Sequence, residues 1–188
     1  MDDGGPRLDS LLSGLGPDAS PAGVLLVRDA FGWAAQLHAG QIRRDGALVF
    51  DHVLGAAANA VAAGEGDPEV IAAALLHDVV EKTHTTAADL GERFGPRVAH
   101  LVDVLTKRPA EDSETAVRRA LEAGREALLL RLCDRLDGLR RSAGRDPGSR
   151  EHFIATARQV HLPVAEEHFP SLAAAFRTVL DQLGGLHG

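Results

Sequence analysis

Apolar residues recur at spacings of three and four along most of the chain, which is the pattern of amphipathic helices. Ser20-Pro21 is typical of a helix N-cap followed by a first-turn proline. The residues after it follow the helical spacing: Val24, Val27, Ala30, Phe31, Ala34 and Leu37. No run of β-branched residues alternates with polar ones over the length of a strand. The pattern therefore predicts an all-α bundle of roughly eight to ten helices.

One predicted helix differs from the others in having no polar face. Asp67-Pro68-Glu69 repeats the cap-and-proline signature and begins an almost wholly apolar stretch from Val70 to Val80. A helix that is apolar all round is normally buried, so we expect it in the middle of the domain. Further helices are expected from about Asp51 or His52 to Gly64, over 86–94 and over 96–105, and Thr86 with Asp89 resembles a capping box at the start of the second of these. Others are expected in two segments of 114–140 broken near Gly124, up to about His161 before a break or kink at Pro163, and from about Ser171 to Leu183.

The composition suits one domain with a short appendage. Residues 1–20 are rich in Gly, Pro, Asp and Ser and predict a partly ordered N-terminal arm with one apolar piece, Leu8 to Leu15. Residues 21–188 form the predicted single domain. With 188 residues, 45% of them apolar, the chain can build a core without disulfides or a structural metal. The single cysteine, Cys133, lies among leucines and is expected in that core.

Charge and hydropathy exclude several classes of protein. Twenty basic residues against 27 acidic ones give a net charge of −7, which disfavours nucleic-acid binding. No apolar run reaches the length of about 18 residues that a membrane span needs. The first 23 residues do not resemble a signal peptide. We therefore expect a cytoplasmic protein with neither nucleic-acid nor membrane partners.

Two charged positions inside apolar helices carry the candidate chemistry. His77-Asp78 interrupts the most apolar stretch, and Asp134 lies within another apolar helix. Either feature can be purely structural, as a hydrogen-bonded pair or as a salt bridge to a nearby arginine. Positions four apart share a helix face, so His77 and Glu81 should point the same way. Imidazole and carboxylate ligands without a thiolate suit a divalent ion such as Mn²⁺ with open positions for water and substrate.

His52, His77-Asp78 and Asp134 occur in the order and approximate spacing found in HD-domain metal phosphohydrolases, which the chain resembles. The likeness is closest to the hydrolase domain of RelA/SpoT-type proteins and covers about residues 25–165, without a synthetase half. It is similar to the small stand-alone alarmone hydrolases, which include the metazoan SpoT homologue. The stretches that carry this resemblance are 38–46, His52, 74–86, Phe94-Gly95, 101–107 and 131–136.

The resemblance implies an HD-domain helical fold and hydrolysis of the 3′-diphosphate of a guanosine or adenosine alarmone, with release of pyrophosphate. It implies one Mn²⁺ held by His52, His77, Asp78 and Asp134. Glu81 would orient or deprotonate the attacking water. The residues implied to contact this nucleotide substrate are Arg43 at the base, Arg44 near the base or phosphate, and Arg135 and the position of Gly138 near the sugar and phosphates.

The chain departs from the family pattern close to this site. The family's Glu-Asp pair is Glu81-Lys82 here, so Lys82 is expected to pair with Asp78 or to meet a substrate phosphate. Gly138 stands where the family usually has Asn. Val49 and Val53 replace the family's Tyr and Pro, and Thr156-Ala157 replaces Glu-Thr.

These departures keep other functions open. The four metal ligands favour a working hydrolase, but the substrate could be another nucleotide, for example the 2′-phosphate of NADPH. A degenerate domain that binds a nucleotide without turnover is a second alternative, motivated by Lys82 and Gly138. A helical bundle without a ligand would leave four ligand-type residues unexplained. The sequence does not determine the assembly, and a homo-oligomer is compatible with it.

Overall fold

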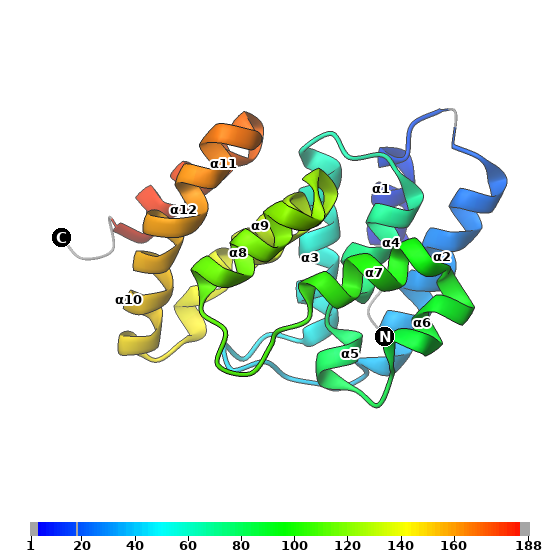
Figure 1. Cartoon of the computed structure of the whole chain (residues 1–188), viewed down its shortest axis with the longest axis horizontal. Coiled ribbons are helices and arrows are strands. Elements are labelled where there is room, and N and C mark those ends of the chain that lie inside the picture. The colour runs from blue at the N-terminus through cyan, green and yellow to red at the C-terminus, as the bar shows by residue number, and fades with distance from the viewer. Residues whose placement is uncertain (1–3, 18, 185–188) are drawn as a thin grey trace.

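The computed structural model describes residues 4–17 and 19–184, and helices joined by short connections make up most of them (Figure 1). A single antiparallel bridge between Ile42 and Leu48 is the one β pairing in the described ranges. The α-helices, in chain order, are α1 (Gly4–Gly14), α2 (Pro21–Leu37), α3 (Val49–Ala62), α4 (Pro68–Leu76), α5 (Val79–Lys82), α6 (Ala87–Phe94), α7 (Pro96–Leu105), α8 (Ser113–Ala123), α9 (Arg125–Arg140), α10 (Pro147–Thr156), α11 (Leu162–His168) and α12 (Pro170–Gly184).

Two irregular segments complete this list: a 3₁₀ turn, Ser142–Gly144, and a π-helical turn, Ala157–His161. The π turn joins α10 to α11 without a break, and only His77 and Asp78 separate α4 from α5. If α10 and α11 are counted as one unit, and α4 and α5 as another, the described residues form ten helical units. The all-α prediction is confirmed. None of these helices has the length and hydropathy that crossing a membrane requires, as far as the structure describes the chain.

The sequence signals for helix starts are confirmed. Ser20, Asp67 and Thr86 each accept a backbone hydrogen bond in the first turn that follows, and Thr86 forms a complete capping box with Asp89. The chain stays helical across Pro163, where a break or kink was expected. The widened π turn just before it accommodates a proline that has no N–H to donate.

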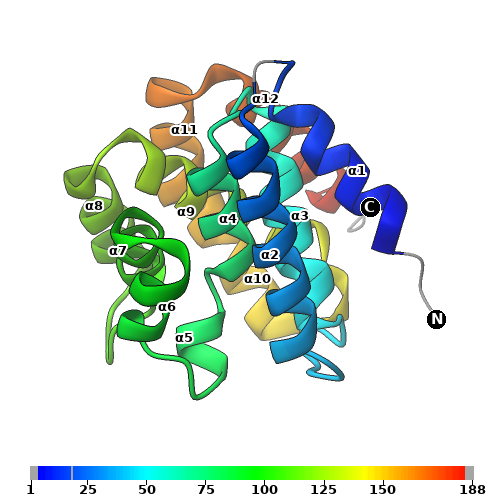
Figure 2. The same cartoon turned by 90° about the vertical axis from the view of Figure 1, so that its right-hand side faces the viewer.

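Helix α4 is the centre of the core. Its residues from Val70 to Leu76 are at most 1% exposed, and it packs against α2, α3, α7 and α9. Figure 2 shows α4 in the middle of the molecule between α2 and α7. The predicted central helix is thus confirmed, but its predicted end at Val80 is wrong. Asp78 adopts φ −94° and ψ −8°, a turn conformation that interrupts the helix before α5 begins.

The apolar piece of the predicted N-terminal arm forms part of the core. Helix α1 packs against α3 and α2, and Leu11 and Leu15 are 3% and 7% exposed. Arg7 donates to Asp51 of α3 at 2.6 Å. Residues 4–17 are therefore folded onto the domain, because burial of these leucines stabilises the helix more than its own propensity could.

Helices α3 and α9 lie side by side between α1 and α2 at one end of the molecule and α10 to α12 at the other (Figure 1). The side chain of Asn59 on α3 donates to the Cys133 carbonyl on α9 at 3.0 Å, and Cys133 is fully buried as expected. This pair of helices brings His52 and Asp134, which are far apart in the chain, to the same place.

Candidate metal centre and active site

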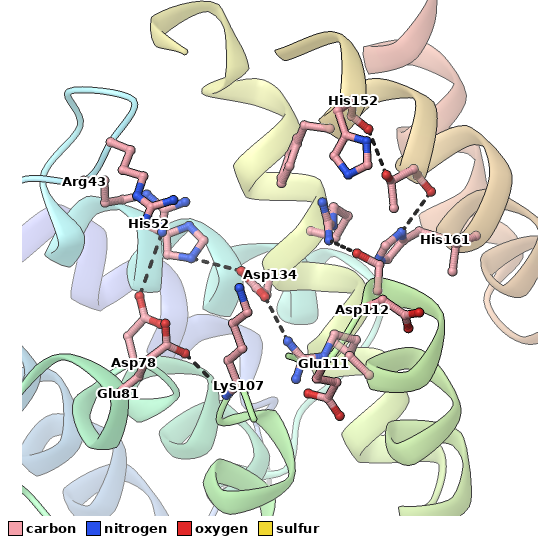
Figure 3. A pocket seen from close by; sticks show the side chains of 18 of the residues that line it. Arg43, His52, Asp78, Glu81, Lys107, Glu111, Asp112, Asp134, His152 and His161 are labelled. Atoms are coloured by element: carbon pink, nitrogen blue, oxygen red, sulfur yellow. Dashed lines mark hydrogen bonds and ion pairs between the residues drawn. The ribbon is translucent and has the colours of Figure 1, made fainter. Parts of the chain in front are cut away.

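An open cavity of about 800 Å³ lies where α3, the α4–α5 turn, α9 and α10 meet (Figure 3). Its size is that of a small-molecule site. Most of its lining is charged: Arg43, Arg44, Asp45, His52, Asp78, Glu81, Lys82, Lys107, Glu111, Asp112, Ser113, Glu114, Ala116, Arg131, Asp134, Arg135, Arg145, His152, Phe153, Thr156, Val160 and His161.

His52 on α3 is held between two carboxylates of α9. Its Nδ1 donates to Asp137 Oδ2 at 2.7 Å, and its Nε2 lies 3.1 Å from Asp134 Oδ1. An ionised carboxylate only accepts, so Nδ1 carries a proton and Nε2 is directed at Asp134. This is the carboxylate–histidine arrangement that orients metal-binding imidazoles.

His77, at the end of α4, has one nitrogen without a partner. Its Nδ1 donates to the Ala74 carbonyl at 2.8 Å, which leaves Nε2 to act as an acceptor. Nε2 is buried and has no hydrogen-bond partner among the described residues. It lies 3.8 Å from Asp134 Oδ1 and 3.7 Å from Asp78 Oδ1. Such a buried lone pair costs free energy unless something binds it.

The geometry fits a divalent metal ion. One ligand atom each from His52, His77 and Asp134 lies within 4.8 Å of the others. Nitrogen and carboxylate ligands bind a divalent ion at about 2.0–2.2 Å, so two ligands of one ion stand about 3–4 Å apart. The distances of Asp134 Oδ1 from the two imidazole Nε2 atoms, 3.1 and 3.8 Å, lie within that range.

Asp78 stands beside this group but outside it. Its Oδ2 lies 2.7 Å from Lys82 Nζ and 3.9 Å from Arg43 Nη1, while its Oδ1 faces His77. Burial would raise the pKa of Asp78, but His77 and Lys82 outweigh burial and lower it to about 2. The Asp78 carboxylate is therefore ionised, with Oδ1 facing His77 and Oδ2 paired with Lys82.

The pKa values of the two imidazoles are shifted in opposite directions. Burial alone would lower the pKa of His52, but its hydrogen bonds with Asp134 and Asp137 raise it to about 9. Burial lowers the pKa of His77 and keeps its imidazole neutral. Burial would also raise the pKa of Asp134, yet the bond with His52 holds it well below its ordinary value. His77 and the ionised carboxylates thus have the protonation that metal ligands need, whereas His52 must lose a proton before it can bind an ion.

Glu81 and the loop after α7 form the lower wall of the cavity in Figure 3. Glu81 is 40% exposed, and its Oε2 accepts from the Lys107 backbone N–H at 3.3 Å. The Lys107 side chain extends into the cavity towards Asp134 (Figure 3). Glu81 lines the cavity, whereas His77 is buried behind its wall.

The predicted substrate residues are only partly brought together. Arg43, Arg44 and Arg135 line the cavity, and Arg135 donates to Ser113 Oγ at 3.0 Å. Gly138 is absent from the described lining. A Cβ at Gly138 would lie 3.0 Å from the Phe153 ring, so this ring fills the space that a side chain would need.

Asp137, Phe153 and Arg145 were missed by the sequence analysis. Asp137 had a readable signal, because it lies three residues after Asp134 on the same helix face and between buried leucines. The sequence contained no such signal for Phe153 and Arg145, because they reach the cavity from α10 and from the loop before it.

Three comparisons with known proteins show what the chain is similar to. A family model described as HD domain matches residues 30–168. The chain is 35% identical over 152 residues to a probable GTP pyrophosphokinase of Mycobacterium leprae, covering 77% of this chain and 19% of that protein. It is 33% identical over 147 residues to a guanosine-3′,5′-bis(diphosphate) 3′-pyrophosphohydrolase of Aquifex aeolicus, and this match covers 74% of this chain and 21% of that protein. The chain thus spans about a fifth of the length of these curated relatives.

A solved structure of a metazoan ortholog of SpoT that hydrolyzes ppGpp superposes with a TM-score of 0.75 at 26% identity. The match covers 90% of this chain and 99% of that one. The family model spans most of the chain, including His52, His77-Asp78 and Asp134. The chain therefore belongs to the HD-domain family.

Proposed function

We propose that the protein is a metal-dependent phosphohydrolase that removes the 3′-diphosphate of a (p)ppGpp-type or ppApp-type alarmone and releases pyrophosphate. The observation that carries this proposal is the His52–His77–Asp134 group, with the unpartnered His77 Nε2, beside a cavity rich in arginine. Similarity over nearly the whole length of a SpoT ortholog that hydrolyzes ppGpp supports the substrate class.

His52, His77, Asp78 and Asp134 would hold the ion, and we propose Mn²⁺. The donors are two imidazoles and two carboxylates with no thiolate, a set that suits Mn²⁺ and leaves open positions. When bound, the ion would polarise the phosphoryl group and lower the pKa of a water molecule.

The chain's own residues would supply the remaining chemistry. Glu81 is the carboxylate next to the ligand turn that is partly exposed and lines the cavity, so it would accept the proton of the attacking water. Lys107, which extends towards Asp134, would neutralise the leaving pyrophosphate (Figure 3). Arg43 is 13% exposed and anchored by Asp45 at 3.3 Å, so it would form a rigid contact with the nucleotide.

The test is a product-resolved assay with Mn²⁺ that offers ppGpp, pppGpp, ppApp and NADPH and measures pyrophosphate and orthophosphate separately. We expect pyrophosphate from an alarmone. His77→Ala should abolish both metal content and turnover, whereas Glu81→Ala should retain the metal and lose rate. Orthophosphate from NADPH, or tight nucleotide binding without product, would contradict the proposal.

A further inference from the structure

Two guanidinium groups lie over the ring of Phe153 on α10. The Arg135 and Arg145 guanidinium carbons both lie 4.1 Å from the ring centroid. All three residues line the cavity that contains the candidate metal group. Stacking on a ring is favourable for guanidinium, and it fixes both planar groups with their N–H edges free to bind a ligand.

Gly138 makes this arrangement possible. The Phe153 ring atoms lie 3.0 and 3.4 Å from the position that a Cβ of residue 138 would occupy. A side chain there would push the ring, and with it the two guanidinium groups. Because position 138 has no side chain, Phe153 and its two arginines can form this wall of the cavity.

The protein neutralises the positive charge on this wall only in part. Within the described part of the chain, Arg135 and Arg44 have no carboxylate within ion-pair distance, and Arg135 donates only to the Ser113 hydroxyl. Arg145 Nη2 lies 4.0 Å from Asp45 Oδ2, but the same oxygen also accepts from Arg43 at 3.3 Å. Arg145 Nε is buried without a hydrogen-bond partner among the described residues.

Crowded and partly buried cations are costly unless an anion is bound between them. Arginine forks that are fixed in place are the usual means of binding a phosphate through paired hydrogen bonds.

We infer that Arg145 and Arg135, both stacked on the Phe153 ring, form a second phosphate site that binds the 5′-phosphates of the substrate. This inference rests on the proposed function, in which the 3′-diphosphate lies at the metal group and the 5′-phosphates are the other anionic part of an alarmone. Arg135 directly follows the candidate ligand Asp134 on α9, so both sites lie within reach of one nucleotide. The substrate class is therefore a nucleotide phosphorylated at both its 3′ and 5′ positions.

Product binding tests this site without requiring turnover. Titration calorimetry with GDP and with ADP, in EDTA so that no metal mediates the contact, measures affinity for the 5′-diphosphate. Arg145→Gln should weaken the binding of the preferred nucleotide at least about tenfold, the effect expected for loss of a charge-assisted hydrogen bond. Phe153→Leu, which keeps both charges but removes the ring on which they stack, should also weaken it.

Arg125→Gln is the matched control, because its guanidinium lies 4.4 Å from the Phe169 ring but outside this cavity. It should leave nucleotide affinity unchanged, and thermal unfolding of all three variants shows whether they are folded. A second comparison uses guanosine 3′-diphosphate with a free 5′-hydroxyl. Arg145→Gln should lower kcat/KM for ppGpp about tenfold and leave that for the 5′-hydroxyl substrate unchanged.

The outcomes separate this inference from the proposed function. If neither nucleoside diphosphate binds, or if folded Arg145→Gln binds it as the native chain does, the second phosphate site is wrong even when alarmones are hydrolysed. If no alarmone is hydrolysed but GDP or ADP binds in an Arg145-dependent way, the phosphate site stands and the proposed reaction is wrong.

Discussion

Lys82 is the residue whose charge bears most directly on the candidate metal group. Its ammonium lies 2.7 Å from Oδ2 of Asp78, and the Asp78 side chain is only 9% exposed. A cation entering the group therefore meets a ligand that is already paired and a positive charge nearby. Since buried charges are weakly screened, Lys82 should reduce the affinity for the metal.

Lys82→Met should accordingly raise the affinity for Mn²⁺ about tenfold, because the cation paired with the candidate ligand Asp78 is removed. Calorimetric titration of the metal-free protein measures this. Lys107→Met is the control, since it removes the chain's other lysine, which also lines the cavity but forms no ion pair with Asp78 within the described structure. Equal effects of the two variants would show that the pair with Asp78 is not the cause.

The absence of a side chain at Gly55 on α3 allows Asp137 to reach His52. A Cβ at this glycine would lie 1.8 Å from Asp137 Oδ1, so any side chain would displace the carboxylate. Asp137 is 3% exposed and bonded to both His52 and Arg141 at 2.7 Å, which leaves it no alternative position in which its charge is paired.

Gly55→Ala should therefore lower metal affinity by about 10–100-fold, the effect typical of losing the partner that orients a ligand histidine. The matched control is Gly32→Ala on α2, where nothing lies within 4 Å of the added methyl. That variant should keep metal affinity and gain about 0.5–1 kcal/mol of unfolding free energy from better helix propensity. Unchanged metal binding in Gly55→Ala would mean that Asp137 does not orient His52.

Helix α1 shows how packing rather than propensity orders an element. Its sequence is rich in glycine, serine and proline, which predicted a partly ordered arm. Leu11 and Leu15 nevertheless join the core against α3. In the structure, the apolar piece of the predicted arm is therefore part of the core of the domain.

Leu11→Ala should cost about 2–5 kcal/mol of unfolding free energy, the range for removing a buried leucine side chain. Leu121→Ala on α8 serves as control, because Leu121 is 45% exposed and should cost less than about 1 kcal/mol. Urea unfolding of both variants gives the comparison. A small loss for Leu11→Ala would indicate that α1 is not held against the domain in solution.

At the scale of the whole molecule, the candidate ligands tie together α3, the α4–α5 turn and α9. In the metal-free protein, His52 holds a proton because its pKa is raised from 6.5 to about 9. The stabilisation from this raised pKa is complete below about pH 6.5 and is lost as the pH rises through 9. A metal ion must displace the same proton, so its apparent affinity should increase with pH over this window.

Mn²⁺ at about 100 times its dissociation constant should therefore stabilise the fold by about 2.7 kcal/mol. At one fixed metal concentration, the increase in Tm should be larger at about pH 8 than at about pH 6.5, as the sign of the His52 shift requires. Thermal unfolding with and without metal measures both effects, and His77→Ala should show neither. A Tm increase that falls with pH would contradict the assignment of His52 as a ligand.

The sequence by itself determined what depends on neighbours along the chain. The caps at Ser20, Asp67 and Thr86 and the apolar stretch of α4 involve residues within one or two turns, so their patterns are readable without a fold. The ligand-type residues could be named as well, because histidine and aspartate inside apolar helices are rare unless they are bound or paired.

Only the tertiary structure decided what depends on distance between helices. The approach of α3 to α9 puts Asp137 on His52 and makes Gly55 necessary, and the position of α10 brings Phe153 over Gly138. The pattern along the chain also reads as continuous helix through His77-Asp78, where the structure has a break. Such contacts between helices join residues that are up to 85 positions apart, and nothing in the local pattern records which of them will meet.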